Sequence, residues 1–123
     1  MPTDPTQMFC YLTTTGRVSG RPHTIEIWFA RRDATLYLLS GGGDRSDWVR
    51  NLQRRPEVVV RIGHRHGRAL PGRARVLDPG TPEDELARDL LVEKYQPSYG
   101  GDLTGWRRSS LPVAVDLEDE ADG

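Results

Sequence analysis

The segment 17–21, Arg-Val-Ser-Gly-Arg, places two guanidinium groups and a hydroxyl on one short polar stretch between two apolar runs. An arginine offers several N–H donors in a fixed plane, which suits a phosphate or a carboxylate. His23 and Thr24 follow closely and add two more polar groups. The segment therefore predicts an anion-binding turn. An ordinary solvated hairpin is the alternative interpretation, because glycine, serine and arginine are all common in turns.

A second polar segment, Ser40 to Gly43, contains three consecutive glycines and precedes Arg45 and Ser46. Because glycine lacks a Cβ, this backbone can approach a flat ring or a phosphate closely. Free N–H groups at the start of a following helix would add partial positive charge. The spacing matches neither the dinucleotide fingerprint nor the P-loop, so it indicates neither NAD nor ATP. A ligand-binding loop and a flexible loop are both open here.

Three aromatic residues, Tyr95, Tyr99 and Trp106, lie in and around a glycine-rich stretch near the end of the chain. Aromatic side chains among glycines often anchor a loop by packing against the core. They also form good lids over flat substrates. Both roles are open on this pattern alone.

Other kinds of catalytic site have little support. His64 and His66 lie two residues apart in an arginine-rich turn without a nearby carboxylate or cysteine, so no metal site is predicted. No Ser/His/Asp set, carboxylate pair or Cys/His pair stands out, which leaves the catalytic residues unassigned. Cys10, the single cysteine, lies in an apolar run and is expected to be a core residue.

The length of 123 residues predicts a single domain over residues 1–117, followed by an acidic, disordered tail at 118–123. No apolar run approaches the roughly 18 residues of a membrane span. The first four residues lack the basic and apolar pattern of a signal peptide. With a single cysteine as well, the chain is expected to be cytoplasmic.

Positive charge is concentrated in the middle of the chain, although the formal net charge is only −1. The segment 45–75 holds nine arginines against two acidic residues. A nucleic-acid-binding module would interleave such arginines with exposed aromatic residues, and residues 49–94 contain none. No nucleic-acid partner is therefore predicted, and the arginines are left to an anionic small molecule or to solubility alone.

The apolar periodicity predicts five or six strands and two helices. Alternation of apolar and polar residues favours an antiparallel meander at the start of the chain. One helix is expected after Asp44 or Ser46 and before Pro56, and another from a Thr-Pro-Glu-Asp start at 81 to about 95. The expected strands span 8–15, 23–31, 35–40, 57–63, 68–77 (interrupted by Pro71-Gly72) and 112–117. This pattern indicates a mainly β (α+β) fold, a small barrel rather than a sandwich.

Taken in order, these motifs resemble the deazaflavin-dependent nitroreductase family. The resemblance rests on Leu-Thr-Thr-Thr-Gly-Arg-x-Ser-Gly-Arg-Pro-x-Thr (12–24), Ser-Gly-Gly-Gly (40–43), Asp-Trp-x-x-Asn-Leu (47–52) and Pro-Glu-Val-x-Val (56–60). It covers residues 9–62, with a looser match at 111–113. It implies a split β-barrel of about six antiparallel strands with two helices. That fold is related to the pyridoxamine-phosphate-oxidase-like flavin-binding proteins.

The resemblance also implies a cofactor and an activity. The cofactor is coenzyme F-420, a deazaflavin with a phosphate and an oligoglutamate tail. The activity is hydride transfer from its reduced form to a small-molecule acceptor: a quinone, a nitroaromatic or an activated alkene. An FMN-binding split-barrel flavoprotein and a non-catalytic deazaflavin carrier are the alternatives. A homodimer is a further expectation.

By position, the segment 17–24 would face the oligoglutamate tail of the coenzyme. The glycine segment 40–43 would face the ring and its linker, and Arg45 would face the phosphate. The coenzyme-binding residues implied by the resemblance are Arg17, Ser19, Gly20, Arg21, His23, Thr24, Ser40, Gly41, Gly42, Gly43, Arg45, Ser46, Trp48 and Asn51. The substrate-facing residues implied by it are Tyr95, Tyr99 and Trp106.

Overall fold

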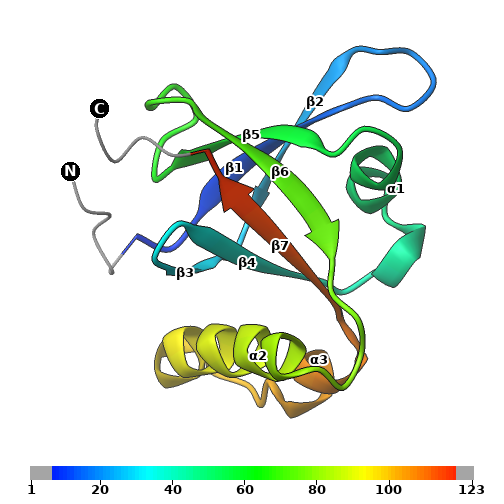
Figure 1. The fold of residues 1–123 in the computed structure, drawn as a ribbon. Helices are drawn as coiled ribbons and strands as arrows, with labels where there is room; N and C mark the ends of the chain where they lie inside the picture. Colours follow the sequence, from blue (N-terminus) through cyan, green and yellow to red (C-terminus); the bar gives the residue numbers. More distant parts are fainter. Residues whose placement is uncertain (1–6, 119–123) are drawn as a thin grey trace.

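Seven antiparallel strands form one curled sheet in the computed structural model, which describes residues 7–118 (Figure 1). Their order across the sheet is β2-β1-β5-β6-β7-β4-β3. The sheet curls into a half-barrel, so the mainly β class predicted from the sequence is confirmed. In chain order the strands are β1 (Cys10–Thr15), β2 (Pro22–Ile27), β3 (Ala30–Arg32), β4 (Thr35–Ser40), β5 (Glu57–Ile62), β6 (Leu70–Val76) and β7 (Leu111–Leu117).

Three α-helices accompany the sheet: α1 (Asp47–Arg54), α2 (Pro82–Tyr95) and α3 (Thr104–Ser109). Two 3-10 turns, η1 (Gly43–Arg45) and η2 (Gln96–Ser98), precede α1 and follow α2. The first two helices were predicted, whereas α3 lies in a stretch interpreted as a loop. Helix α3 has six residues and no side-chain cap, so it carries little sequence signal.

The strand predicted at 23–31 is broken at Trp28 and Phe29. It forms β2 and β3, which lie at opposite edges of the sheet. Phe29 is buried in the barrel, and the Tyr95 hydroxyl of α2 contacts both its amide nitrogen and its carbonyl oxygen at 3.0 Å. Helix α2 thus supplies hydrogen bonds that a neighbouring strand would otherwise provide. This lets the chain cross from one edge of the sheet to the other.

Strand β6 runs through Pro71-Gly72 without the predicted interruption. A Cβ on Gly72 would lie 2.8 Å from Val115 Cγ1, so glycine is what allows β6 and β7 to approach each other here. The Pro71 carbonyl accepts a hydrogen bond from the Glu118 amide at 2.9 Å. Glu118 begins the predicted acidic tail, whose residues 119–123 lie outside the described residues.

The core has two parts that share strand β4. Leu36 and Leu38 face the interior of the half-barrel, while Tyr37 and Leu39 face α2 on the other side of the sheet. Strand β4 is therefore buried on both faces. In Figure 1 it lies above α2. Cys10 lies in the barrel core as predicted, and burial raises the pKa of its thiol to about 12.

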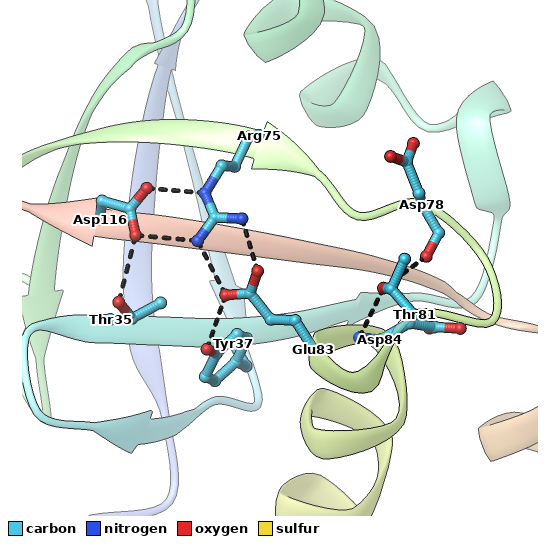
Figure 2. A network of polar contacts seen from close by, with 8 residues as sticks. All are labelled: Thr35, Tyr37, Arg75, Asp78, Thr81, Glu83, Asp84 and Asp116. Carbon is cyan, nitrogen blue, oxygen red and sulfur yellow. Dashed lines mark hydrogen bonds and ion pairs between the residues drawn. The ribbon is translucent and has the colours of Figure 1, made fainter.

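Helix α2 is fastened to the sheet by an ion network at its first turn (Figure 2). The guanidinium of Arg75 on β6 contacts both oxygens of Glu83 on α2, at 2.7 and 2.8 Å, and both oxygens of Asp116 on β7. Tyr37 on β4 donates to the same Glu83 carboxylate at 2.8 Å. The Thr81 hydroxyl caps the helix by accepting from the Asp84 amide. These contacts fix the orientation of α2.

Candidate functional site

A cleft of about 490 Å³ opens between β2 and the segment that leads into α3. This volume lies within the range of small-molecule binding sites. It is termed the aromatic cleft. Its lining residues are Phe9, Glu26, Ile27, Trp28, Leu39, Tyr99, Asp102, Leu103 and Trp106.

Trp28 is the centre of the aromatic cleft. Its indole stacks on Tyr95 with ring centroids 4.2 Å apart and an interplanar angle of 3°. Tyr99 and Trp106 each meet it edge-on, at centroid distances of 5.8 and 5.5 Å. Three rings thus hold Trp28 in one orientation, which is what a preformed binding surface requires.

Tyr95 does not line the cleft, although the family resemblance placed it there. The structure puts it behind Trp28, with its side chain packed in the core and 1% of the residue exposed. Its hydroxyl contacts the carbonyl oxygens of Met8 and Phe29 and the amide of Phe29. Burial raises the pKa of this hydroxyl to about 12. Tyr95 therefore supports the cleft from beneath, while Tyr99 and Trp106 form its walls.

Trp106 connects the aromatic cleft to the glycine segment Ser40–Gly43. A Cβ on Gly41 would lie 3.9 Å from two atoms of the Trp106 indole. Helix α3, which carries Trp106, is held against α2 because Arg107 pairs with Glu85 and Asp89. The glycine segment and Trp106 are thus direct neighbours. The ion pairs between α2 and α3 hold Trp106 in this position.

The glycine segment is a tight turn tied by hydroxyl groups. The Ser40 hydroxyl donates to the Gly43 carbonyl at 2.9 Å and also contacts the Ser46 hydroxyl at 3.0 Å. Ser46 is the N-cap residue of α1, but its hydroxyl contacts Ser40 and makes no capping bond. Gly43 has a φ of +63°, which favours glycine. These contacts fix the conformation of the loop.

A second cleft, of about 220 Å³, lies between the β1–β2 hairpin and α1. It is termed the hairpin cleft. In Figure 1 the hairpin projects from the sheet above α1. The lining residues are Gly16, Arg17, Val18, Ser19, His23, Asp47 and Asn51. Four of the residues expected to bind the coenzyme are therefore brought together here.

Asn51 holds the hairpin cleft together. It is 3% exposed, and its amide donates to the Thr14 hydroxyl at 3.1 Å. Its Oδ1 accepts from the Arg17 backbone amide at 3.1 Å and from the Arg17 guanidinium at 2.8 Å. The guanidinium also pairs with Asp47 at 3.2 Å. Arg17 is therefore engaged in holding the hairpin onto α1.

The guanidinium groups of Arg21 and Arg45 make no hydrogen bond or ion pair with any residue between 7 and 118. Both residues are exposed, so both can bind an external anion. Thr24 pairs with Thr13 across β1 and β2, and Trp48 packs against the barrel core. Neither of these two expected coenzyme residues lines a cleft.

The sequence reasoning missed the residues that form the floor and rim of the aromatic cleft, namely Trp28, Glu26 and Asp102. One signal was available. Trp28 shares the polar face of its strand with Glu26, where a large aromatic residue is out of place unless something covers it. Asp102 carried no signal, because it lies in a loop.

The curled antiparallel half-barrel is the split-barrel-like fold that the family resemblance implied. Within this class, the family model for F420H(2)-dependent quinone reductase matches residues 3–118. The chain belongs to that family. It is therefore an oxidoreductase that depends on coenzyme F-420, as the motif resemblance implied.

Solved structures share the fold. An F-420-H2-dependent reductase is 25% identical with a TM-score of 0.65, over 89% of this chain and 93% of that one. An FAD-binding protein from Mesorhizobium loti is 23% identical with a TM-score of 0.61, over 91% and 82%. The heme storage protein HutZ from Vibrio cholerae is 13% identical with a TM-score of 0.73, over 92% and 83%. These neighbours are named for three different cofactors, so the fold alone does not select one.

The residues of the site fit a coenzyme with a flat ring and an anionic portion. Arg21 and Arg45 supply positive charge that no described residue neutralises. A Cβ on Gly43 would meet no atom within 4 Å, so the turn leaves open space beside its backbone. Among the described residues, no helix is both long enough and apolar enough to cross a membrane.

Proposed function

We propose that the protein transfers hydride from reduced coenzyme F-420 to a planar acceptor that binds in the aromatic cleft. The acceptor classes are a quinone, a nitroaromatic or an activated alkene. One observation carries this proposal: the Trp106 indole touches the position of a Gly41 Cβ and also walls the cleft. A ring held at the glycine segment would therefore lie next to an acceptor in the cleft.

The coenzyme-binding roles follow from the charges and the turn. The backbone of Ser40–Gly43 would contact the ring and linker, and Arg45 with the start of α1 would meet the phosphate. The oligoglutamate tail of the coenzyme would lie at the hairpin, next to Arg21, Ser19 and His23. Arg17 and Asn51 would act by holding the hairpin in place. When bound, the reduced coenzyme supplies the hydride.

The chain's own contribution to the reaction is to orient the acceptor and to exclude water. Trp28 presents a fixed ring, and Ile27 and Leu39 add apolar surface. Holding two reactants in contact removes much of the entropic barrier to their reaction. The amide and hydroxyl of Thr104 lower the pKa of Asp102, so this carboxylate is ionised at neutral pH and is no proton donor there.

Turnover tests the proposal directly. The protein is mixed with reduced coenzyme F-420 and menadione, a nitroimidazole or cyclohexenone, and coenzyme oxidation is followed by absorbance, with FMN in parallel. We expect oxidation well above the protein-free rate for at least one acceptor. Coenzyme binding without turnover of any acceptor would favour the carrier function. Binding of FMN alone would favour the flavoprotein.

A pair of variants gives a control for the location of the acceptor. Trp106→Leu removes a wall of the cleft, whereas Val76→Ala changes an apolar side chain that packs against the barrel core outside both clefts. We expect the first variant alone to lose about tenfold or more in kcat/KM for the acceptor, since positioning errors of this kind are costly. Equal losses in both variants would contradict the assignment. A homodimer stays a prediction that size-exclusion chromatography with light scattering can test.

A further inference from the structure

We infer that the aromatic cleft selects a planar organic cation, such as an N-alkylated pyridinium or phenazinium ring, over a neutral acceptor of similar size. The hydride step in this inference rests on the proposed function. The binding preference does not, because it follows from the walls of the cleft alone.

The charged residues that line the aromatic cleft are all acidic. The lining residues within the described part of the chain include two carboxylates, Glu26 and Asp102, and no arginine, lysine or histidine. Glu26 accepts a hydrogen bond from the Tyr11 hydroxyl at 2.8 Å, and Asp102 accepts from the Thr104 amide and hydroxyl. Neither forms an ion pair with another described residue. Two carboxylates thus face the cleft without an ion-pair partner among residues 7–118.

The cations near these walls are engaged with other groups. Arg65 lies over the ring of Tyr11, whose hydroxyl donates to Glu26, with its guanidinium carbon 5.0 Å from the ring centroid. Arg107, next to Trp106, pairs with Glu85 and Asp89 on α2. Lys94 donates to the Phe29 carbonyl at 2.9 Å and lies 3.7 Å from the centroid of the Phe29 ring, on the core side of the β2–β3 crossover. A positive charge in the cleft would have to come from the ligand.

The ring surfaces favour the same kind of ligand. Trp28 and Trp106 meet nearly at right angles, with an interplanar angle of 82°, so they form two sides of a corner. Tyr99 adds a second edge-on contact to Trp28. The faces of Trp and Tyr rings carry negative electrostatic potential and attract organic cations. Aromatic walls with carboxylates at the rim are the combination that recognises such a cation.

A cationic acceptor also suits the chemistry of hydride transfer. A C–H bond of the reduced coenzyme breaks, and the hydride with its electron pair forms a C–H bond at a ring carbon of a pyridinium or an N–H bond at the unsubstituted ring nitrogen of a phenazinium. The acceptor is reduced and becomes neutral, while the coenzyme is oxidised and releases its remaining acidic proton to solvent. No proton has to be delivered to the acceptor. The neutral product has lost its attraction to the carboxylates, which favours its release.

The test removes the two charges without removing their hydrogen bonds. The variant Glu26→Gln/Asp102→Asn is compared with Glu57→Gln/Asp78→Asn, which loses the same charge at exposed positions outside the cleft. Steady-state kinetics use N-methylphenazinium as the cationic acceptor and menadione as the neutral one. Separately, N-methylquinolinium is titrated into coenzyme-free protein, and its binding is measured by quenching of tryptophan fluorescence.

We expect the cleft variant to raise KM for N-methylphenazinium about fivefold or more, as two partly exposed charge contacts are lost. Its kcat should change less than about twofold, because the carboxylates stabilise the bound cation before the hydride neutralises it. KM for menadione should stay constant, as should both values in the control variant. Quinolinium binding should weaken in the cleft variant alone.

The outcomes separate this inference from the proposed function. Turnover of menadione with equal KM values for the cation in both variants would overturn the cation preference and leave the hydride transfer intact. Charge-dependent quinolinium binding without any turnover would support the cation site and overturn the proposed reaction. Unchanged quinolinium binding in the cleft variant would overturn the inference whatever the kinetics show.

Discussion

The aromatic cleft and the hairpin cleft are built from different kinds of interaction. The aromatic cleft lies over buried residues, with Trp28 stacked on Tyr95 and Leu39 at its base. The hairpin cleft lies between a projecting hairpin and α1, and it is held by polar contacts of Arg17 and Asn51 (Figure 1). The aromatic cleft depends on apolar packing, which salt affects little. The hairpin cleft depends on charges and hydrogen bonds near solvent, which salt weakens.

The difference indicates a division of work within one site. Exposed arginines such as Arg21 and Arg45 can attract an anionic coenzyme but cannot fix it to within a fraction of an ångström. The rings around Trp28 can fix a flat acceptor, because their own orientations are set by the core. Binding energy would come mainly from the first region and geometry from the second. The following predictions test each region separately.

The largest effect is expected at Asn51, which anchors the hairpin cleft. Asn51→Ala leaves the Arg17 amide and guanidinium without their shared acceptor. We expect the free energy of unfolding in urea to fall by about 2–4 kcal/mol, since the part-buried donors of Arg17 lose their acceptor and the buried Thr14 hydroxyl loses its donor. Gln53→Ala, at an exposed position on the same helix, is the control and should cost under about 0.5 kcal/mol. Similar losses in both variants would show that Asn51 does not anchor the hairpin.

A smaller effect is expected at Tyr95, the support of the aromatic cleft. Tyr95→Phe keeps the stack on Trp28 but removes the hydroxyl that contacts Met8 and Phe29. We expect the free energy of unfolding to fall by about 1–3 kcal/mol, because the buried Phe29 amide loses its acceptor. Tyr99→Phe, at an exposed ring of the same cleft, should change stability by under about 0.5 kcal/mol. Equal changes in the free energy of unfolding for Tyr95→Phe and Tyr99→Phe would contradict the supporting role of the Tyr95 hydroxyl.

The smallest effect concerns the ion network that fastens α2 beneath the aromatic cleft. Hydrogen bonds from Arg75 lower the pKa values of Glu83 and Asp116 in the folded protein. A carboxyl group whose pKa is lower in the folded than in the unfolded protein stabilises the fold at any pH above its unfolded pKa, which is 4.5 for Glu83 and 3.8 for Asp116. This stabilisation is lost as the pH falls through the pKa of the group in the folded protein. Because Arg75 and Asp116 side chains are 43% and 47% exposed, the total should be only about 0.5–1 kcal/mol.

Chemical denaturation of wild type and Arg75→Gln at several pH values measures this network. The stability difference should be largest above about pH 5 and should shrink as the pH falls through the lowered pKa values of Glu83 and Asp116. Arg73→Gln, which breaks an exposed single pair with Glu57, should show a smaller difference throughout. A difference for Arg75→Gln that does not change with pH would contradict the assigned ion pairs.

The sequence predicted the strands, two of the helices and the family because their signals are local. A continuous apolar run marks β4, and the Thr81-Pro82 start marks α2. The break at Trp28 and Phe29 could not be predicted, since it depends on hydrogen bonds to Tyr95, 66 residues away in sequence. Tertiary contacts override strand periodicity there.

The candidate site was predicted in part for the same reason. The residues of the hairpin cleft come from one motif and from α1, so their types and spacing pointed to them. The aromatic cleft combines residues from β2, β4 and the segment before α3, and only the fold brings these together. Arg17 shows a further limit. Residue type indicated an anion ligand, but Asn51 and Asp47 occupy its guanidinium.

Comparison of Arg21→Gln with Trp106→Leu tests the division between the two regions most directly. The measured quantities are the Kd of coenzyme F-420 and kcat/KM for menadione at saturating coenzyme. Arg21→Gln should raise the Kd by about 5–30-fold at low salt, equivalent to one charge-assisted contact, with a smaller effect at high salt and little change in kcat/KM. Trp106→Leu should lower kcat/KM by about tenfold or more while the Kd changes by under about threefold. If each variant instead changed both quantities by similar factors, the separation of coenzyme binding from acceptor positioning would be contradicted.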